Sequence, residues 1–175
     1  MSGASLEERL ARLEAVRAIA DLKSRYARLA DEKYTSGHER VAEARWRDVA
    51  ALQAACFTDD ARWHGGEQFG GTLTGRVELA AFFERSPWRF ALHYYVSPAI
   101  AIHSETTAEA TWRLWQLGLP LDAQAPVLLA GSTIETYRRT GGEWLIESMR
   151  FTEIHTVDLS AAPAALRCVL SRSDA

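Results

Sequence analysis

The sequence has few cysteines, no excess of positive charge and no long apolar run. Its two cysteines, Cys56 and Cys168, lie in unrelated contexts, which gives neither a metal-ligand spacing nor a disulfide framework, so we expect two reduced thiols. Lysine and arginine number 20 against 23 aspartates and glutamates, and no basic stripe indicates a nucleic-acid partner. No polybasic or long apolar segment indicates a membrane partner, and the charged first residues are unlike a signal peptide. We therefore expect a cytoplasmic protein.

The common catalytic motifs are also missing. The chain has no glycine-rich phosphate loop, no nucleophile elbow and no HExxH. Chemistry must then come from acid–base groups in a pocket, and the sequence indicates no metal and no cofactor. What is present is a 175-residue chain, 47% hydrophobic, long enough for one domain with a core. It contains six tryptophans, a residue that fills cores and also lines ligand pockets.

A long amphipathic helix is predicted for residues 6–32. Ser5 and Glu8 fit a capping box, and apolar residues follow at steps of three and four. The stripe drifts around the helix axis between Leu13 and Leu22, which a kink or two shorter helices would explain. It consists of Leu6, Leu10, Leu13, Val16, Ile19, Leu22, Tyr26 and Leu29.

Two further helices and a run of strands follow. Helices are predicted for residues 41–56, with Trp46, Val49, Leu52 and Ala55 along one side, and for residues 76–86, with Leu79, Phe82 and Phe83 inward. Residues 58–60 read as a turn before a short strand over residues 61–64. Four long strands are predicted for residues 90–103, 106–118, 127–139 and 143–157. Pro98 predicts a bulge or an edge position in the first of them.

Helices followed by strands are typical of an α+β fold with helices packed on one face of an antiparallel sheet. We expect a single domain over residues 1–158 and a C-terminal tail over residues 159–175. Whether the sheet curves around a cavity, and whether the tail covers it, does not follow from the pattern.

Asp31 lies in the last turn of the first helix, where the helix dipole disfavours a carboxylate. One interpretation is a solvated helix end, in which Glu32 and Lys33 form the solvated edge of the same turn. Helix geometry supports this, because Asp31 lies about 140° around the axis from Tyr26. The other interpretation places Asp31 inward, since small residues share its face and allow close approach. These are Ala20, Ser24 and Ala27.

Other candidates have two interpretations each. Strand alternation places His93 on one face with Ala91 and Tyr95, either as a core histidine or as an acid–base group. Trp63 is either a core residue or a ligand contact. Arg150 lies between Met149 and Phe151. If buried, it needs a carboxylate, a carbonyl or a ligand anion, and otherwise it reaches the solvated rim.

Three short segments resemble a known family. Residues 17–22 (RAIADL), followed by Tyr26 and Asp31, resemble the first helical region of SnoaL-like proteins of the nuclear transport factor 2-like superfamily. Residues 55–63 (ACFTDDARW) are similar to the exit of that family's second helix. Residues 92–94 (LHY) and the turn at residues 141–144 follow in the family's order. The resemblance spans roughly residues 10–155 and includes the family's scytalone dehydratases, bile-acid dehydratases and hexachlorocyclohexane dehydrochlorinases.

The resemblance implies a cystatin-like α+β fold, in which a curved antiparallel sheet forms a cone-shaped barrel against N-terminal helices and encloses a pocket. It also implies a homo-oligomer, either a dimer or a trimer, and catalysis without a cofactor. The family's lyases use an Asp–His pair, which corresponds to Asp31 and His93 here, and its substrate-binding tyrosine and tryptophan correspond to Tyr26 and Trp63.

Arg150 matches the family's pattern less directly than these four residues do. The family's pocket arginine lies on the last strand, so the resemblance makes Arg150 a third substrate-binding candidate, although Arg150 lies one residue later, counted from Trp144. A shift of one residue turns a side chain to the other face of a strand unless a bulge intervenes.

These residues support three hypotheses. The first is a cofactor-independent lyase, a dehydratase or dehydrohalogenase, that acts on an apolar and cyclic small molecule, with His93 as base and Asp31 fixing its tautomer. The second is a steroid or polyketide isomerase or cyclase that uses the same proton transfer. The third is a non-catalytic binding module, in which Asp31 and His93 do not interact.

Overall fold

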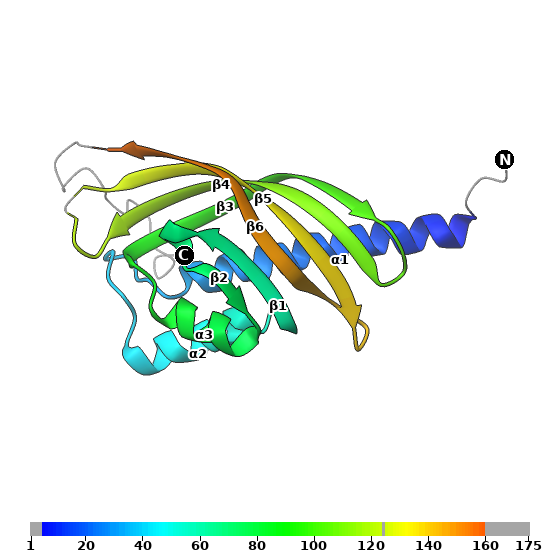
Figure 1. Cartoon of the computed structure of the whole chain (residues 1–175), viewed down its shortest axis with the longest axis horizontal. Helices are drawn as coiled ribbons and strands as arrows, with labels where there is room; N and C mark the ends of the chain where they lie inside the picture. Colours follow the sequence, from blue (N-terminus) through cyan, green and yellow to red (C-terminus); the bar gives the residue numbers. More distant parts are fainter. Residues whose placement is uncertain (1–4, 124, 160–175) are drawn as a thin grey trace.

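The computed structural model describes residues 5–123 and 125–159, so Cys168 and nearly all of the predicted tail lie outside the described residues. These described residues form three α-helices and six strands, in an order that confirms the α+β prediction (Figure 1). The helices are α1 (Leu6–Asp31), α2 (Glu43–Ala54) and α3 (Arg76–Glu84), with a short 3-10 turn, η1 (Glu67–Phe69). The strands are β1 (Phe57–Gly66), β2 (Gly71–Thr74), β3 (Trp88–Ile102), β4 (Thr107–Pro120), β5 (Val127–Thr140) and β6 (Glu143–Asp158).

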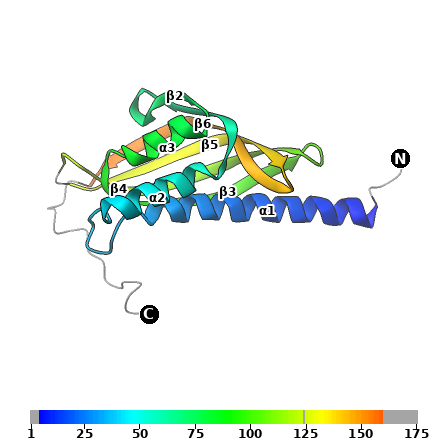
Figure 2. The ribbon, with the colours of Figure 1, turned by 90° about the horizontal axis from the view of Figure 1, so that it is seen from below.

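All six strands form one curved sheet in the order β2-β1-β6-β5-β4-β3. Neighbouring strands are antiparallel except β1 and β6, which run parallel. The sheet does not close into a barrel, because β2 and β3 remain its two edges. Figures 1 and 2 show the helices together on its concave side, with α1 running along the sheet and α2 and α3 beside it. No helix within residues 5–123 and 125–159 has the length and apolar character needed to cross a bilayer.

The first helix is one unbroken element, so the expected kink is wrong. Ser5 and Glu8 form the predicted capping box. The drift of the apolar stripe has another cause: the first half of α1 extends past the sheet (Figure 2), and Leu6, Leu10 and Leu13 are exposed there. The second half packs against the core, where the later stripe residues Ile19, Leu22, Tyr26 and Leu29 are buried.

Two local predictions need correction. The buried face of α2 carries Trp46, Val49, Ala50, Gln53 and Ala54, whereas Leu52 and Ala55 are exposed. The buried face of α2 therefore follows the positions i, i+3, i+4 and i+7 counted from Trp46. The prediction used steps of three alone, which drift off this face. Residues 58–60 continue β1 and form no turn.

The four long strands lie where the sequence predicts them, to within two residues at each end. Pro98 lies at both predicted features: β3 is an edge strand, and its pairing with β4 shifts between Val96 and Ala99, where Ser97 takes a positive φ of 49°. Trp112 is buried and Trp115 exposed, as expected for residues on opposite faces of a strand.

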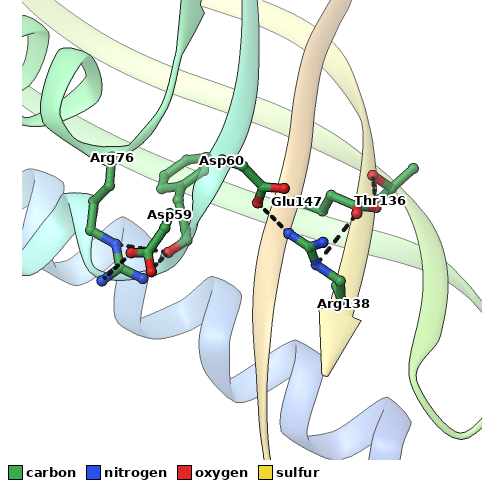
Figure 3. Close-up of polar contacts among 7 residues, drawn as sticks. Asp59, Asp60, Arg76, Thr136, Arg138 and Glu147 are labelled. Carbon is green, nitrogen blue, oxygen red and sulfur yellow. Dashed lines mark hydrogen bonds and ion pairs between the residues drawn. The ribbon is translucent and has the colours of Figure 1, made fainter. Parts of the chain in front are cut away.

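Acidic residues of β1 pair with arginines of α3 and, across β6, of β5 (Figure 3). Asp59 pairs with Arg76 of α3, whose guanidinium also donates to the carbonyl oxygen of Phe57. Asp60 pairs with Arg138 of β5. The two carboxylates of the ACFTDDARW segment are largely exposed, so these pairs orient β1 and contribute little net stability.

A buried ion pair lies between α1 and the sheet. Lys23 Nζ is 2.5 Å from Glu135 Oε1, and neither side chain is more than 1% exposed. Glu135 also accepts from Thr133 Oγ1 at 2.7 Å and from the Tyr137 hydroxyl. Trp112 Nε1 donates to that hydroxyl at 2.9 Å. Because the Glu135 carboxylate is fully occupied by these partners, the ion pair fixes the rotation of α1 about its own axis relative to β5.

Removing one charge of this pair should destabilise the domain strongly. Glu135→Gln leaves the Lys23 ammonium buried without a carboxylate, and we expect a loss of about 3–5 kcal/mol in the free energy of unfolding. Lys23→Met/Glu135→Gln should recover most of that loss. Denaturant titration measures both variants, and equal stability of the single and double variants would contradict this account.

Candidate active site

The C-terminal end of α1 and the edge strand β3 bring Asp31 and His93 together. His93 Nδ1 lies 2.8 Å from Asp31 Oδ1, and the same oxygen accepts the peptide N–H of His93 at 3.0 Å. The peptide N–H is available because, in the part of the chain that the structure describes, no strand pairs with β3 on that side. A carboxylate only accepts, so in a neutral imidazole Nδ1 carries the proton and Nε2 keeps its lone pair. The side chains are 15% and 14% exposed, so the contact is largely shielded from water.

A pocket with about 670 Å³ of empty space, part of it open to solvent, lies between the sheet and the helices. His93 lines it, and Asp31 reaches it through His93. Its walls are mainly aromatic and aliphatic, which suits an apolar ligand. The aromatic lining consists of Tyr26, Tyr34, Trp63, Phe69, Phe82, Phe83, Trp88, Tyr95 and Phe151.

Tyr26 and Trp63 both line this pocket, where the family resemblance places them. The Tyr26 ring packs edge-on against Phe57 and Tyr95, with centroids 5.7 and 6.0 Å apart. Burial raises the pKa of Tyr26, and the negative charge of Glu135 adds to this shift. The Tyr26 hydroxyl therefore stays protonated.

Trp63 is fixed by its indole nitrogen. Nε1 donates to the carbonyl oxygen of Phe69 at 2.7 Å, and the ring packs against Phe82 and Phe151. Gly65 makes this bond possible, because a Cβ there would lie 1.8 Å from that carbonyl oxygen. Trp63 is thus both a core residue and a pocket wall.

Arg150 is not brought to the pocket. Its side chain is exposed, whereas Met149 is buried and Phe151 lines the pocket. Counted from the inward-facing Trp144, simple alternation would turn Arg150 inward. The pairing of β6 with β5 gains one residue at Glu147, and this bulge reverses the alternation.

Comparisons with known proteins agree with this fold. The sequence profile of the SnoaL-like domain matches residues 11–150. The chain belongs to the SnoaL-like family. No curated protein sequence matches this chain.

Similar solved structures include a hexachlorocyclohexane dehydrochlorinase of type 2 (TM-score 0.69, 20% identity, covering 92% of this chain and 97% of that one). The type 3 enzyme from Novosphingobium barchaimii is comparable (TM-score 0.68, 22% identity, covering 92% and 98%). A protein from Novosphingobium aromaticivorans, provisionally named a scytalone dehydratase, has a TM-score of 0.69 at 18% identity, covering 86% and 91%. At these identities the likeness establishes the fold.

Within residues 5–123 and 125–159 of this SnoaL-like domain, no three His, Cys, Asp or Glu side chains group as metal ligands would. Cys56 is free and buried, and burial raises the pKa of its thiol.

Lys33 is a pocket residue that the sequence analysis missed. It was expected at the solvated edge of the helix end, yet it is 4% exposed and lines the pocket with His93. Glu32 does face solvent in part and pairs with Arg45. A signal for Lys33 was present, because it lies seven residues after Tyr26 and continues the buried stripe.

Burial and the nearby charge of Arg40 lower the pKa of Lys33 from 10.5 to about 7, against a smaller opposing effect of Asp31. Between these two pH values the unfolded chain holds the Lys33 proton and the folded chain does not, so stability should rise with pH through this window. Below pH 7 the folded state carries a buried charge, which is the least favourable condition.

Lys33→Met should therefore stabilise the domain at acidic and neutral pH, by about 3–5 kcal/mol at most. The gain should shrink as the pH rises from 7 towards 10.5. Denaturant titration across that range measures the difference, with Arg9→Met at an exposed position as a control that should show no pH trend. A gain independent of pH would contradict the assignment.

Proposed function

We propose that this protein is a cofactor-independent lyase that removes a proton and a leaving group from an apolar, cyclic small molecule. The observation that carries this proposal is the bond of 2.8 Å between His93 Nδ1 and Asp31 Oδ1 at the wall of an aromatic pocket. Similarity to dehydrochlorinase folds and to the provisionally named scytalone dehydratase supports the reaction class.

In this mechanism His93 Nε2 takes a proton from a carbon beside a carbonyl or a leaving group. Asp31 holds the imidazole in the tautomer that leaves Nε2 free, and its charge stabilises the imidazolium that forms. Two hydrogen bonds to one carboxylate oxygen fix both the ring and the backbone of His93. The base is thus positioned before substrate enters.

Tyr26 and Trp63 act on the substrate in different ways. The Tyr26 hydroxyl stays protonated and donates to a carbonyl or to the departing group. Trp63 is held by its bond to Phe69 and offers a rigid aromatic surface to a cyclic substrate. An isomerase or cyclase would use the same groups, and product mass separates these outcomes: loss of water or hydrogen halide for the lyase, no change for an isomerase.

His93→Ala and Asp31→Asn should each lower kcat by about 10²–10⁴-fold with the fold intact, because each removes the positioned base. Turnover of scytalone and hexachlorocyclohexane, followed by mass spectrometry of the products, gives the measurement. His103→Ala is the matched control, since His103 is an exposed histidine outside the pocket lining. Full activity in either site variant would refute the mechanism.

The proposal includes self-association. Tyr94 and Trp115 face each other across β3 and β4 on the outer side of the sheet, where they are 56% and 48% exposed. Two exposed aromatic rings side by side are typical of an interface. We expect a dimer or trimer in sedimentation velocity, and a shift towards monomer for Trp115→Lys. A wild-type monomer, or a variant with unchanged mass, would contradict this.

A further inference from the structure

Lysine is used in this chain only in the interior. The sequence has two lysines, Lys23 and Lys33, and the remaining 18 of its 20 basic residues are arginines (20 − 2 = 18). Both lysines are buried, at 1% and 4% exposure. Arginine keeps its charge wherever it is placed, whereas a buried lysine amine readily loses or gains a proton. The two lysines therefore invite comparison.

Their surroundings differ. Lys23 is compensated by Glu135, which in turn is held by Thr133 and Tyr137. Lys33 has no carboxylate within 4.0 Å among the described residues, and its Nζ donates only a long bond of 3.3 Å to the carbonyl oxygen of Phe83. A buried amine without a carboxylate partner is costly when it is charged.

The backbone around Lys33 is well anchored. Its carbonyl oxygen accepts the N–H of Val41 at 3.0 Å, and the adjacent Tyr34 pairs with Arg40 across a short bridge. Arg40 is itself held by bonds to the carbonyl oxygens of Trp88 and Ser86. The amine is thus fixed at the wall of the pocket that His93 also lines.

Charges on both sides keep two protonation states of this amine accessible. Burial and the Arg40 guanidinium favour the neutral amine, and the Asp31 carboxylate favours the ammonium form, which leaves the pKa of Lys33 at about 7. A proton donor works best when its pKa lies near the working pH. The other titratable groups that line this pocket are Tyr26, Tyr34, His93 and Tyr95. The helices packed beside the amine present Trp46 and Phe83 to it.

We propose that Lys33 protonates the oxygen that leaves the substrate, while His93 removes the proton from carbon, so that the preferred substrate is an alcohol and not a halide. The inference rests on the proposed function, since it takes His93 as the base. An alkoxide or hydroxide is a poor leaving group that needs a proton, whereas a halide departs without one.

The step balances. The C–H bond breaks and its proton goes to His93 Nε2, while the electron pair of that bond forms the new C=C bond. The C–O bond breaks towards oxygen, which takes a proton from the Lys33 ammonium and leaves as water. The enzyme then holds a His93 imidazolium and a neutral Lys33 amine, and solvent returns a proton to Lys33 as His93 loses one.

The decisive experiment needs no substrate. Para-nitrophenol is an aromatic oxygen acid whose ionised form absorbs visible light, and it serves as a probe of the departing oxygen. At a pH about one unit below the pKa of the free phenol, wild type should bind it as the phenolate beside the Lys33 ammonium. Lys33→Met should bind it at least about tenfold more weakly and in the neutral form. His93→Ala should still bind the phenolate.

Selective labelling of lysine with ¹³C at Cε gives a second readout. Only two lysine signals are expected from this chain, and Lys33→Met identifies the second one. This measurement is made at about pH 8, where most of the free Lys33 amine is neutral because its pKa is about 7. There the probe should move the Lys33 signal towards the ammonium position and leave the Lys23 signal in place. No shift of the Lys33 signal, phenolate binding that survives in Lys33→Met, or phenolate binding lost in His93→Ala would each overturn the proposal.

Lys33→Arg separates charge from proton donation. Its guanidinium keeps a positive charge but does not release a proton in this pH range. We expect this variant to retain phenolate binding and to lose dehydration by about 10²–10⁴-fold, with elimination of hydrogen chloride from hexachlorocyclohexane reduced less than tenfold. An equal fold-loss of activity in dehydration and in elimination of hydrogen chloride would overturn the role of Lys33 and leave that of His93 untouched. Loss of activity in Lys33 variants but not in His93→Ala would instead refute the proposed function.

Discussion

The Asp31 carboxylate joins the end of α1 to the edge of the sheet, because one of its oxygens accepts both the ring and the peptide N–H of His93. A free strand edge is normally a liability, and here the exposed N–H of β3 supplies a hydrogen bond that positions the histidine. Helix position, strand position and imidazole tautomer thus depend on the same contact. Any rotation of α1 would disturb all three together.

The rotation of α1 is in turn set by the pair of Lys23 and Glu135, about two turns earlier in the helix. Lys23 Nζ lies 3.5 Å from the centre of the ring of Tyr95, which lines the pocket. Tyr95 follows His93 by two residues on β3, so the ammonium supports the same strand that carries His93. The buried charges are therefore part of the scaffold that orders the pocket, and their hydrogen bonds make that order specific.

Much of this fold follows from local pattern. The capping box at Ser5, the strand bounds and the irregularity at Pro98 are confirmed, since each depends on residues close in sequence. The pairing of Asp31 with His93 did not follow from the helix angle, which favoured a solvated carboxylate. The helix angle correctly indicates that Asp31 itself does not line the pocket. It gives no information on β3, whose edge Asp31 faces, and Asp31 reaches the pocket only through His93.

Two failures have a common physical cause. The inward or outward direction of Arg150 is decided by a bulge at Glu147, which depends on how β6 pairs with β5. The burial of Lys33 is decided by α2, α3 and β3 closing over the helix end. Both are tertiary effects that override local expectation.

The amino-acid composition indicates the role of the lysines better than their positions in the helix do. The chain has only two lysines, and both are buried. A buried amine suits a site where a proton has to move or where a carboxylate has to be paired. Lys23 is paired with a carboxylate, whereas Lys33 has no carboxylate partner among the described residues.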